Sequence, residues 1–204
     1  MIWFDFPYGL SRRKNHEPWD VRWSDKDVEG LFKSIELVTQ GRGCCFYFWA
    51  PLEQLVAMKG IASKCGWAQL EYVTWTKPYH AAYAFNCLNP VTEHALFGIK
   101  VVEGKVWQSP LTTRNLHRPN SYVYPAVTTF YPDLTGKPCN SCEKPVGLTY
   151  KLMCTMGTKG QNVLVLGAGS GAEVLAALAA GFGVIAVEQD TLSIKLVSAG
   201  LNNS

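Results

Sequence analysis

The sequence lacks the features that would place a chain in a membrane or in the secretory pathway. No run of about 18 apolar residues occurs, so we expect no segment that spans a bilayer. The first residues carry neither the basic stretch nor the apolar core of a signal peptide. Internal repeats and low-complexity tracts are also absent, which excludes a repeat array. We therefore expect an intracellular protein, with no compartment indicated.

A disulfide framework is also missing. Seven cysteines are present, an odd number at irregular spacing, which favours free thiols in an intracellular chain. Cys139 and Cys142 form one Cys-x-x-Cys pair, but a zinc ribbon would need a second pair. His94 and His117 do not lie at ligand spacing. We expect no metal site, and a surface loop around Cys139 and Cys142.

The chain has little net charge. The formal charge is +3 and the isoelectric point is about 8.4, which permits an anionic partner without requiring one. Hydrophobic residues make up 48% of the 204 residues, enough for one domain with a sizeable core. We expect a single domain over residues 1–204, in which residues 102–143, where the hydrophobic periodicity is lost, form an inserted loop region.

Strand and helix patterns alternate over the rest of the chain. Strands are expected over residues 1–5, 44–49, 67–75, 93–101, 162–166 and 183–187. Helices are expected to follow the capping residue Ser24, to begin near Pro51 and Lys144, and to cover 172–180 and 191–199. This alternation predicts an α/β fold with a doubly wound, mostly parallel, Rossmann-like sheet.

A glycine-rich turn is the strongest local signal. A strand over 163–166 leads into Gly167-Ala-Gly169-Ser170-Gly171, and a helical pattern follows. Glycine permits a tight turn and lets a ligand approach the backbone closely. The next strand pattern ends at Glu188, whose carboxylate can accept hydrogen bonds from ribose hydroxyls. These residues predict a site for a nucleoside-containing cofactor, whereas a purely structural turn is the plainer alternative.

The position of this turn in the chain indicates the size of the cofactor. The spacing Gly167-x-Gly169-x-x-Ala172 also permits a dinucleotide, as in a nicotinamide-dependent reductase. Such an enzyme needs a second mononucleotide-binding half downstream, but few residues follow Asp190. A mononucleoside-sized cofactor such as S-adenosylmethionine fits better, because half of the crevice then remains for a substrate.

The opening of the chain carries a second motif, Asp5-Phe6-Pro7-Tyr8. It resembles the Asp-Pro-Pro-Tyr type of signature of the amino-methyltransferases that methylate exocyclic amines of nucleobases. Lys144-Pro145 before the glycine turn, Trp75-Thr-Lys77 at a strand end and the segment 93–100 resemble further landmarks. The catalytic motif precedes the cofactor motif, as in the permuted β-type order. Relatives of RNA adenosine methyltransferase subunits share that order.

The resemblance implies a role for each residue of the motif. The Asp5 carboxylate and the Phe6 carbonyl would hold the amine of the base, Pro7 would stiffen the turn, and Tyr8 would stack on the base. Lys144 and Pro145 would close over the methionine end of S-adenosylmethionine. Aspartate at the first position favours adenine N6 over cytosine N4, in DNA or RNA. The two motifs are then expected to share one cleft at neighbouring strand ends.

Phe6 departs from the family, which has proline there. The backbone carbonyl is retained, but the turn loses stiffness and gains bulk. This departure, together with the short stretch after Asp190, leaves a second function open. A methyltransferase fold without activity could serve as a nucleic-acid-binding or assembly subunit, with a partner subunit or as a homodimer.

Basic and aromatic residues follow the motif directly. Cationic side chains can neutralise phosphates, and aromatic rings can stack on unpaired bases. The alternative is a solvated loop whose tryptophans pack on the core. The predicted nucleic-acid contacts are Arg12, Arg13, Lys14, Trp19 and Arg22. Residues 102–143 are a candidate target-recognition element.

Overall fold

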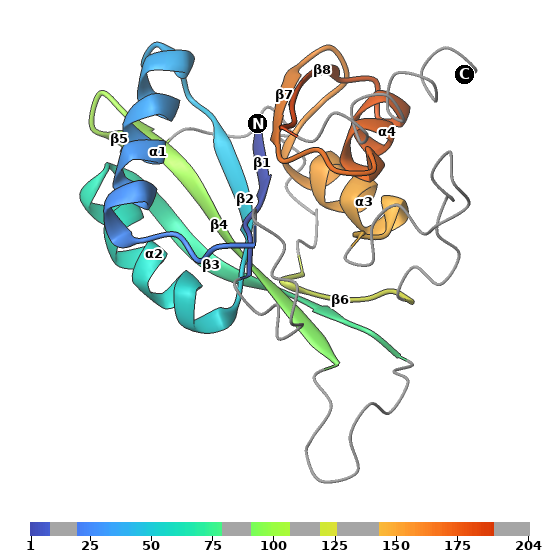
Figure 1. Ribbon diagram of the computed structural model, residues 1–204. Coiled ribbons are helices and arrows are strands. Elements are labelled where there is room, and N and C mark those ends of the chain that lie inside the picture. The colour runs from blue at the N-terminus through green and yellow to red at the C-terminus, as the bar shows by residue number, and fades with distance from the viewer. Residues whose placement is uncertain (9–19, 79–90, 107–118, 126–142, 190–204) are drawn as a thin grey trace, which may run out of the picture. The chain divides into compact units, whose positions relative to one another are not determined.

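A computed structural model describes residues 1–8, 20–78, 91–106, 119–125 and 143–189 (Figure 1). The chain divides into two compact units. The corner unit comprises Phe4–Thr74 and Glu93–Gln108, and the glycine-turn unit comprises Met1–Trp3, Trp75–Thr92 and Ser109–Ser204. Strand β1 (Ile2–Asp5) begins in the glycine-turn unit and ends in the corner unit.

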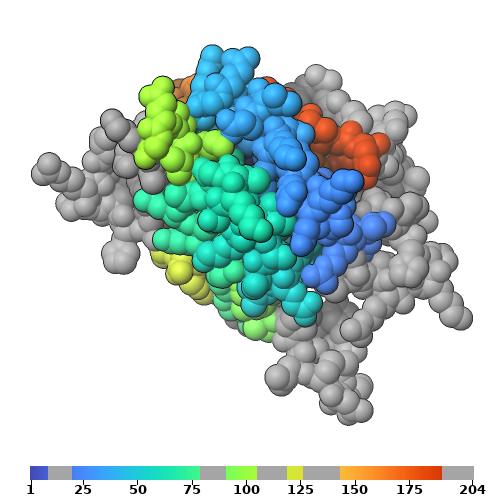
Figure 2. Space-filling model, turned by 90° about the vertical axis from the view of Figure 1, so that its left-hand side faces the viewer, coloured from blue at the N-terminus to red at the C-terminus, as the bar shows by residue number. Residues whose placement is uncertain are grey.

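The corner unit is built on strands in the hydrogen-bonded order β3-β4-β2-β1. They are β2 (Cys45–Trp49), β3 (Trp67–Thr76) and β4 (Thr92–Val102), with β5 (Lys105–Val106) paired to β4. Strands β2 and β4 run antiparallel, and Trp49 lies opposite Ala95. The helices α1 (Asp25–Thr39) and α2 (Leu52–Lys64) lie side by side on one face (Figures 1 and 2).

Helix α1 begins where its capping residues dictate. The Ser24 hydroxyl accepts from the Asp27 amide at 3.3 Å, and the Ser24 amide donates to the Asp27 carboxylate at 2.9 Å. This reciprocal pair satisfies two donors that a helix N-terminus would leave unpaired. The buried residues Val28, Phe32 and Ile35 recur at helical spacing, so the helix presents one apolar stripe to the sheet.

The core of the corner unit is aromatic. All five residues of β2 are buried, as expected for a central strand covered on both faces. Phe32 of α1 packs against Phe46 and Phe48 with ring centroids 5.7 Å apart in both pairs. Gly98 lies opposite Phe46 in β4, and a Cβ there would come within 2.5 Å of the Phe46 ring. The glycine therefore makes room for that ring.

The glycine-turn unit contains a β-α-β arrangement. Strands β7 (Asn162–Leu166) and β8 (Gly183–Val187) are parallel, and α4 (Ala172–Ala179) connects them. Helix α3 (Val146–Met156) packs on α4, and β6 (Ser121–Val123) lies in the same unit. The start of β1 lies beside β7, because the Met1 nitrogen donates to the Asn162 carbonyl and the Leu164 amide donates to the Met1 carbonyl, each at 2.9 Å. This is the pattern of a parallel pair.

The predicted α/β fold class is confirmed, with two differences in detail. β4 is antiparallel to β2, a direction that an apolar strand pattern does not encode. Strands β5 and β6 fall in a stretch where no element was expected. Most of that stretch and the helix expected over 191–199 lie outside the described residues. In the parts described, no helix is both long and apolar enough to cross a bilayer.

Candidate active site

The turn after β1 is anchored to the neighbouring strand. Asp5 is half-buried at the end of β1. The next amide, that of Phe6, donates to the Trp49 carbonyl at 2.9 Å, at the end of β2. The motif Asp5–Tyr8, called the corner from here on, therefore begins at a fixed position on the sheet of its unit.

The Phe6 side chain is part of the core. It is 2% exposed, and its ring centroid lies 4.0 Å from that of Phe4, 5.1 Å from that of Trp23 and 5.3 Å from that of Phe48. Phe4 and Phe6 point to the same face because strand side chains alternate. Buried packing and the amide hydrogen bond thus stabilise the turn where the family has proline, and proline has no N–H to donate.

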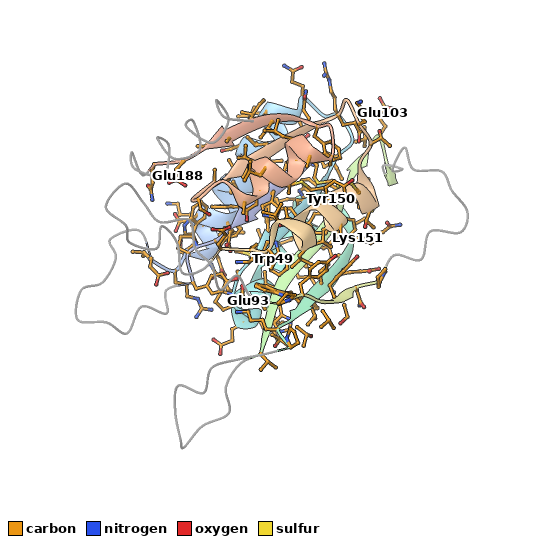
Figure 3. All side chains as sticks on the ribbon, turned by 90° about the vertical axis from the view of Figure 1, so that its right-hand side faces the viewer. Trp49, Glu93, Glu103, Tyr150, Lys151 and Glu188 are labelled. Carbon is orange, nitrogen blue, oxygen red and sulfur yellow. The ribbon has the colours of Figure 1, made fainter. Side chains whose placement is uncertain are left out.

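Tyr8 contacts the first residues of β4. Its hydroxyl donates to the Glu93 carboxylate at 3.1 Å. Because β4 runs antiparallel to β2, its start lies at the edge where β2 ends, and the Ala50 amide donates to the His94 carbonyl at 3.3 Å. Figure 3 shows Trp49 and Glu93 together at this edge. The segment 93–100 was expected to form a strand, but no site role for Glu93 was predicted.

His94 also lies at the start of β4, and its ring is against β3. Nδ1 is 3.2 Å from the Thr74 hydroxyl oxygen. Burial lowers the pKa of His94 below its ordinary value, and the nearby Glu93 carboxylate opposes this shift. A neutral imidazole can share a proton with the threonine hydroxyl. These contacts hold the His94 ring against β3.

The glycine turn adopts the backbone conformation for which glycine is suited. Gly167, Gly169 and Gly171 have φ of 68°, 49° and 88°, a region that L side chains rarely adopt. The Gly167 amide donates to the Val187 carbonyl at 2.8 Å, so the turn is fixed to the end of β8. Ser170 lies half-buried within the turn, and helix α4 begins at Ala172.

Glu188 lies against this turn. Its Oε2 accepts from the Gly169 amide at 2.6 Å, and its Oε1 accepts from the Gln189 amide at 2.7 Å. A carboxylate offers about four lone pairs, so it can accept further hydrogen bonds while it holds the turn. The glycine turn and Glu188, predicted to act together, are therefore adjacent.

Lys144 and Pro145 lie at the start of α3 in the same unit. Pro145 immediately precedes the helix, in agreement with the predicted helix start. Lys144 is only 1% exposed, which is rare for lysine and requires a compensating partner for its charge. Lys144 is therefore not a solvated surface cation.

Of the predicted nucleic-acid contacts, only Arg22 lies in the described residues. Arg12, Arg13, Lys14 and Trp19 lie outside them. Arg22 is exposed, and its guanidinium is 3.8 Å from the Glu53 carboxylate. Trp23, next to it, is half-buried and packs edge-on against Phe4 and Phe6, so this tryptophan packs onto the core from the segment before α1.

The cysteines within the described ranges are free thiols: Cys44, Cys45, Cys65 and Cys154. Burial raises the pKa of the Cys44 thiol to about 11. These ranges contain no cluster of three or more side chains suited to holding a metal ion. Cys139 and Cys142 lie outside the described residues.

Comparison with solved structures identifies the fold. M1.HpyAVI, solved in complex with SAM, is 16% identical with a TM-score of 0.67, over 98% of this chain and 87% of that one. The cytosine-N4-specific PvuII DNA methyltransferase is 12% identical with a TM-score of 0.66, over 97% and 77%. TTHA0409 from Thermus thermophilus, solved with S-adenosyl-L-methionine, is 16% identical with a TM-score of 0.58, over 99% and 84%.

The likeness is one of structure rather than of close sequence. No protein-family model and no curated protein matches the sequence. The match extends over nearly the whole chain and over most of each solved structure. The chain therefore has the fold of the DNA methyltransferases to which it is similar.

Proposed function

We propose that this chain transfers a methyl group from S-adenosylmethionine to the exocyclic amine of a nucleobase in DNA or RNA, with adenine N6 as the favoured target. The observation that carries the proposal is the course of β1. This strand pairs with β7 through Met1, and β7 leads into the glycine turn. Four residues after Met1 the same strand ends at Asp5. The proposal assigns the corner and the glycine turn to a single methyltransferase domain over residues 1–204.

The glycine turn and its surroundings suit S-adenosylmethionine. Glu188 is fixed by the Gly169 amide and retains acceptor capacity for ribose hydroxyls. Two of the similar structures were solved with this cofactor. When bound, it supplies an electrophilic methyl group on a sulfonium. The residues proposed to hold it are Lys144, Pro145, Gly167, Gly169, Ser170, Gly171 and Glu188.

The corner residues act on the base. An exocyclic amine is a poor nucleophile because its lone pair is delocalised into the ring. The Asp5 carboxylate and the Phe6 carbonyl accept its two hydrogens, which localises the lone pair on nitrogen. As the new N–C bond forms and the S–C bond breaks, Asp5 takes the proton that the nitrogen loses. Tyr8 stacks on the base, and alignment of the reacting atoms supplies much of the rate.

Phe6 is compatible with this chemistry. Its carbonyl must point in a fixed direction, which proline at that position would secure by its ring. Here the amide hydrogen bond to Trp49 and the buried ring restrain the same residue. These contacts compensate for the stiffness that the turn loses when phenylalanine stands in place of proline.

The nucleic-acid strand is proposed to follow the loop after the corner. Arg12, Arg13, Lys14 and Arg22 would contact phosphates, and Trp19 would stack on a base. Residues 102–143 would contribute target recognition. A partner subunit or a second copy of the chain would extend this surface.

The test compares two aspartates of the corner unit. Asp5→Ala should abolish methyl transfer to mixed DNA and RNA in a tritiated-methyl assay, with little change in cofactor affinity by isothermal titration calorimetry. Asp25→Ala, an exposed acid in the first turn of α1, is the control and should transfer normally. Mass spectrometry of the nucleosides identifies the methylated base.

Glu188→Ala provides the complementary variant. It should weaken cofactor binding, because it removes the proposed ribose acceptor. Equal turnover by Asp5→Ala and Asp25→Ala would refute the role of the corner. If the unaltered chain binds no S-adenosylmethionine at millimolar concentration, the non-catalytic scaffold is favoured instead.

A further inference from the structure

We infer that Glu93 is a positioning residue, which holds the Tyr8 ring in the orientation that receives the target base. The inference rests on the proposed function, in which Tyr8 stacks on that base. It adds a residue from a distant part of the sequence to the corner. Glu93 acts through Tyr8, and no direct contact with the reacting amine is required of it.

The contact is suited to orienting a ring. Tyr8 lies beyond the end of β1, and its hydroxyl donates to Glu93 Oε2 at 3.1 Å. A hydrogen bond to a carboxylate is stronger than one between neutral groups. The hydroxyl lies in the plane of the ring, so this bond does not compete with a base that stacks on the face. It restricts rotation of the Tyr8 side chain before the base binds. The entropic cost of ordering this side chain on binding is therefore lower.

Glu93 can serve as an anchor because the start of β4 is itself held on two sides. On one side, the carbonyl of the next residue, His94, accepts a hydrogen bond from the Ala50 amide. On the other side, the His94 ring contacts the Thr74 hydroxyl of β3. The register between Trp49 and Ala95 continues this pairing along β2. The carboxylate therefore projects from a fixed backbone, while Tyr8 projects from a turn.

Glu93 is an acid beside a residue that is proposed to stack on a nucleobase. A carboxylate repels the phosphates of a nucleic acid, so an acid beside a base-stacking residue has a cost that a neutral residue would avoid. Holding a tyrosine hydroxyl is a function that offsets this cost. It also explains why the motif ends in tyrosine rather than phenylalanine in this chain, since phenylalanine would stack but could not be anchored.

The experiment measures steady-state methyl transfer with four variants and one control. The variants are Glu93→Ala, Glu93→Gln, Tyr8→Phe and the double variant Tyr8→Phe/Glu93→Ala. The control is Glu103→Ala, which removes an acid just beyond the other end of β4 (Figure 3). Affinity for S-adenosylmethionine and the melting temperature are measured for each.

Loss of the anchor should act on substrate binding. Glu93→Ala and Tyr8→Phe should each raise the KM for the nucleic acid about tenfold to a hundredfold, the effect of one hydrogen bond to a charged group. Cofactor affinity should not change. The double variant should be no worse than either single one, because both remove the same contact. Glu93→Gln keeps an acceptor oxygen and should recover most of the loss, and Glu103→Ala should behave as the unaltered chain.

The outcomes separate this inference from the proposed function. If the unaltered chain transfers methyl groups and Glu93→Ala has the same KM as Glu103→Ala, the inference is wrong and the proposed function stands. Rises in KM that add up in the double variant overturn the inference as well. The inference is also wrong if Glu93→Gln raises the KM as much as Glu93→Ala does and lowers the melting temperature. If the unaltered chain transfers no methyl group, the proposed function fails and this inference fails with it.

Discussion

Replacing Phe6 by proline would restore the family motif, and we predict that it would destabilise this protein. In the structure, Phe6 is a core residue whose amide donates to the Trp49 carbonyl. Phe6→Pro removes both the ring and the donor. A change toward the family sequence should therefore make the turn less well fixed, because the surroundings of residue 6 are built for phenylalanine.

The size of the effect follows from these two losses. Truncation of a buried phenylalanine to alanine costs about 3–5 kcal/mol, and proline retains part of the volume, so we take about 3 kcal/mol for the ring. Loss of the amide hydrogen bond adds about 1 kcal/mol. The total of about 4 kcal/mol corresponds to a fall in the melting temperature of about 8–16 °C for a chain of this size.

Phe6→Leu is the matched control. It keeps the amide donor and most of the apolar volume, and it should cost no more than about 1.5 kcal/mol. The free energies of unfolding are measured in urea, and methyl transfer is measured in parallel. Phe6→Pro should lose transfer where Phe6→Leu keeps most of it. A proline variant as stable and as active as the leucine variant would refute the assignment of Phe6 as an anchored core residue.

Two further predictions concern stability. Burial raises the Cys44 pKa to about 11 from 9.0, so the native thiol should resist alkylation at pH 8. The contribution of Cys44 to the free energy of unfolding should be complete below pH 9 and lost as the pH rises through 11. The loss should be at most about 2.7 kcal/mol. In urea titrations, Cys44→Ala should remove this part of the pH dependence. Gly98→Ala should cost about 1–3 kcal/mol, because its Cβ would meet the Phe46 ring, whereas Gly30→Ala in α1, with open space around it, should be neutral or stabilising by up to about 1 kcal/mol.

Local sequence signals predicted the elements well. The start of α1 follows from Ser24 and its capping partner Asp27, and the glycine turn follows from three glycines after an apolar strand. Each of these signals lies within a few residues of the structure that it determines. For this reason helices α1–α4 and strands β1–β4, β7 and β8 could be placed from the sequence alone, whereas the short strands β5 and β6 could not.

The signals that failed are long-range. An apolar strand pattern does not encode its direction, so the antiparallel course of β4 was not predicted. The contact between Tyr8 and Glu93 joins residues 85 positions apart, and no local pattern marks it. From the sequence, Phe6 in place of proline was expected to make the turn less stiff. The sequence does not show that the Phe6 amide donates to the Trp49 carbonyl or that Trp23 packs on its ring.

The direction of β4 is what gives the corner its acid. Glu93 and Glu103 lie near opposite ends of this strand, and only the start of the strand lies where β2 ends, beside Ala50. Were β4 parallel to β2, its first residues would lie at the far edge of the sheet, and Glu93 could not reach Tyr8. The antiparallel direction of β4 is therefore what brings Glu93, from late in the corner unit, next to the corner at the beginning of that unit.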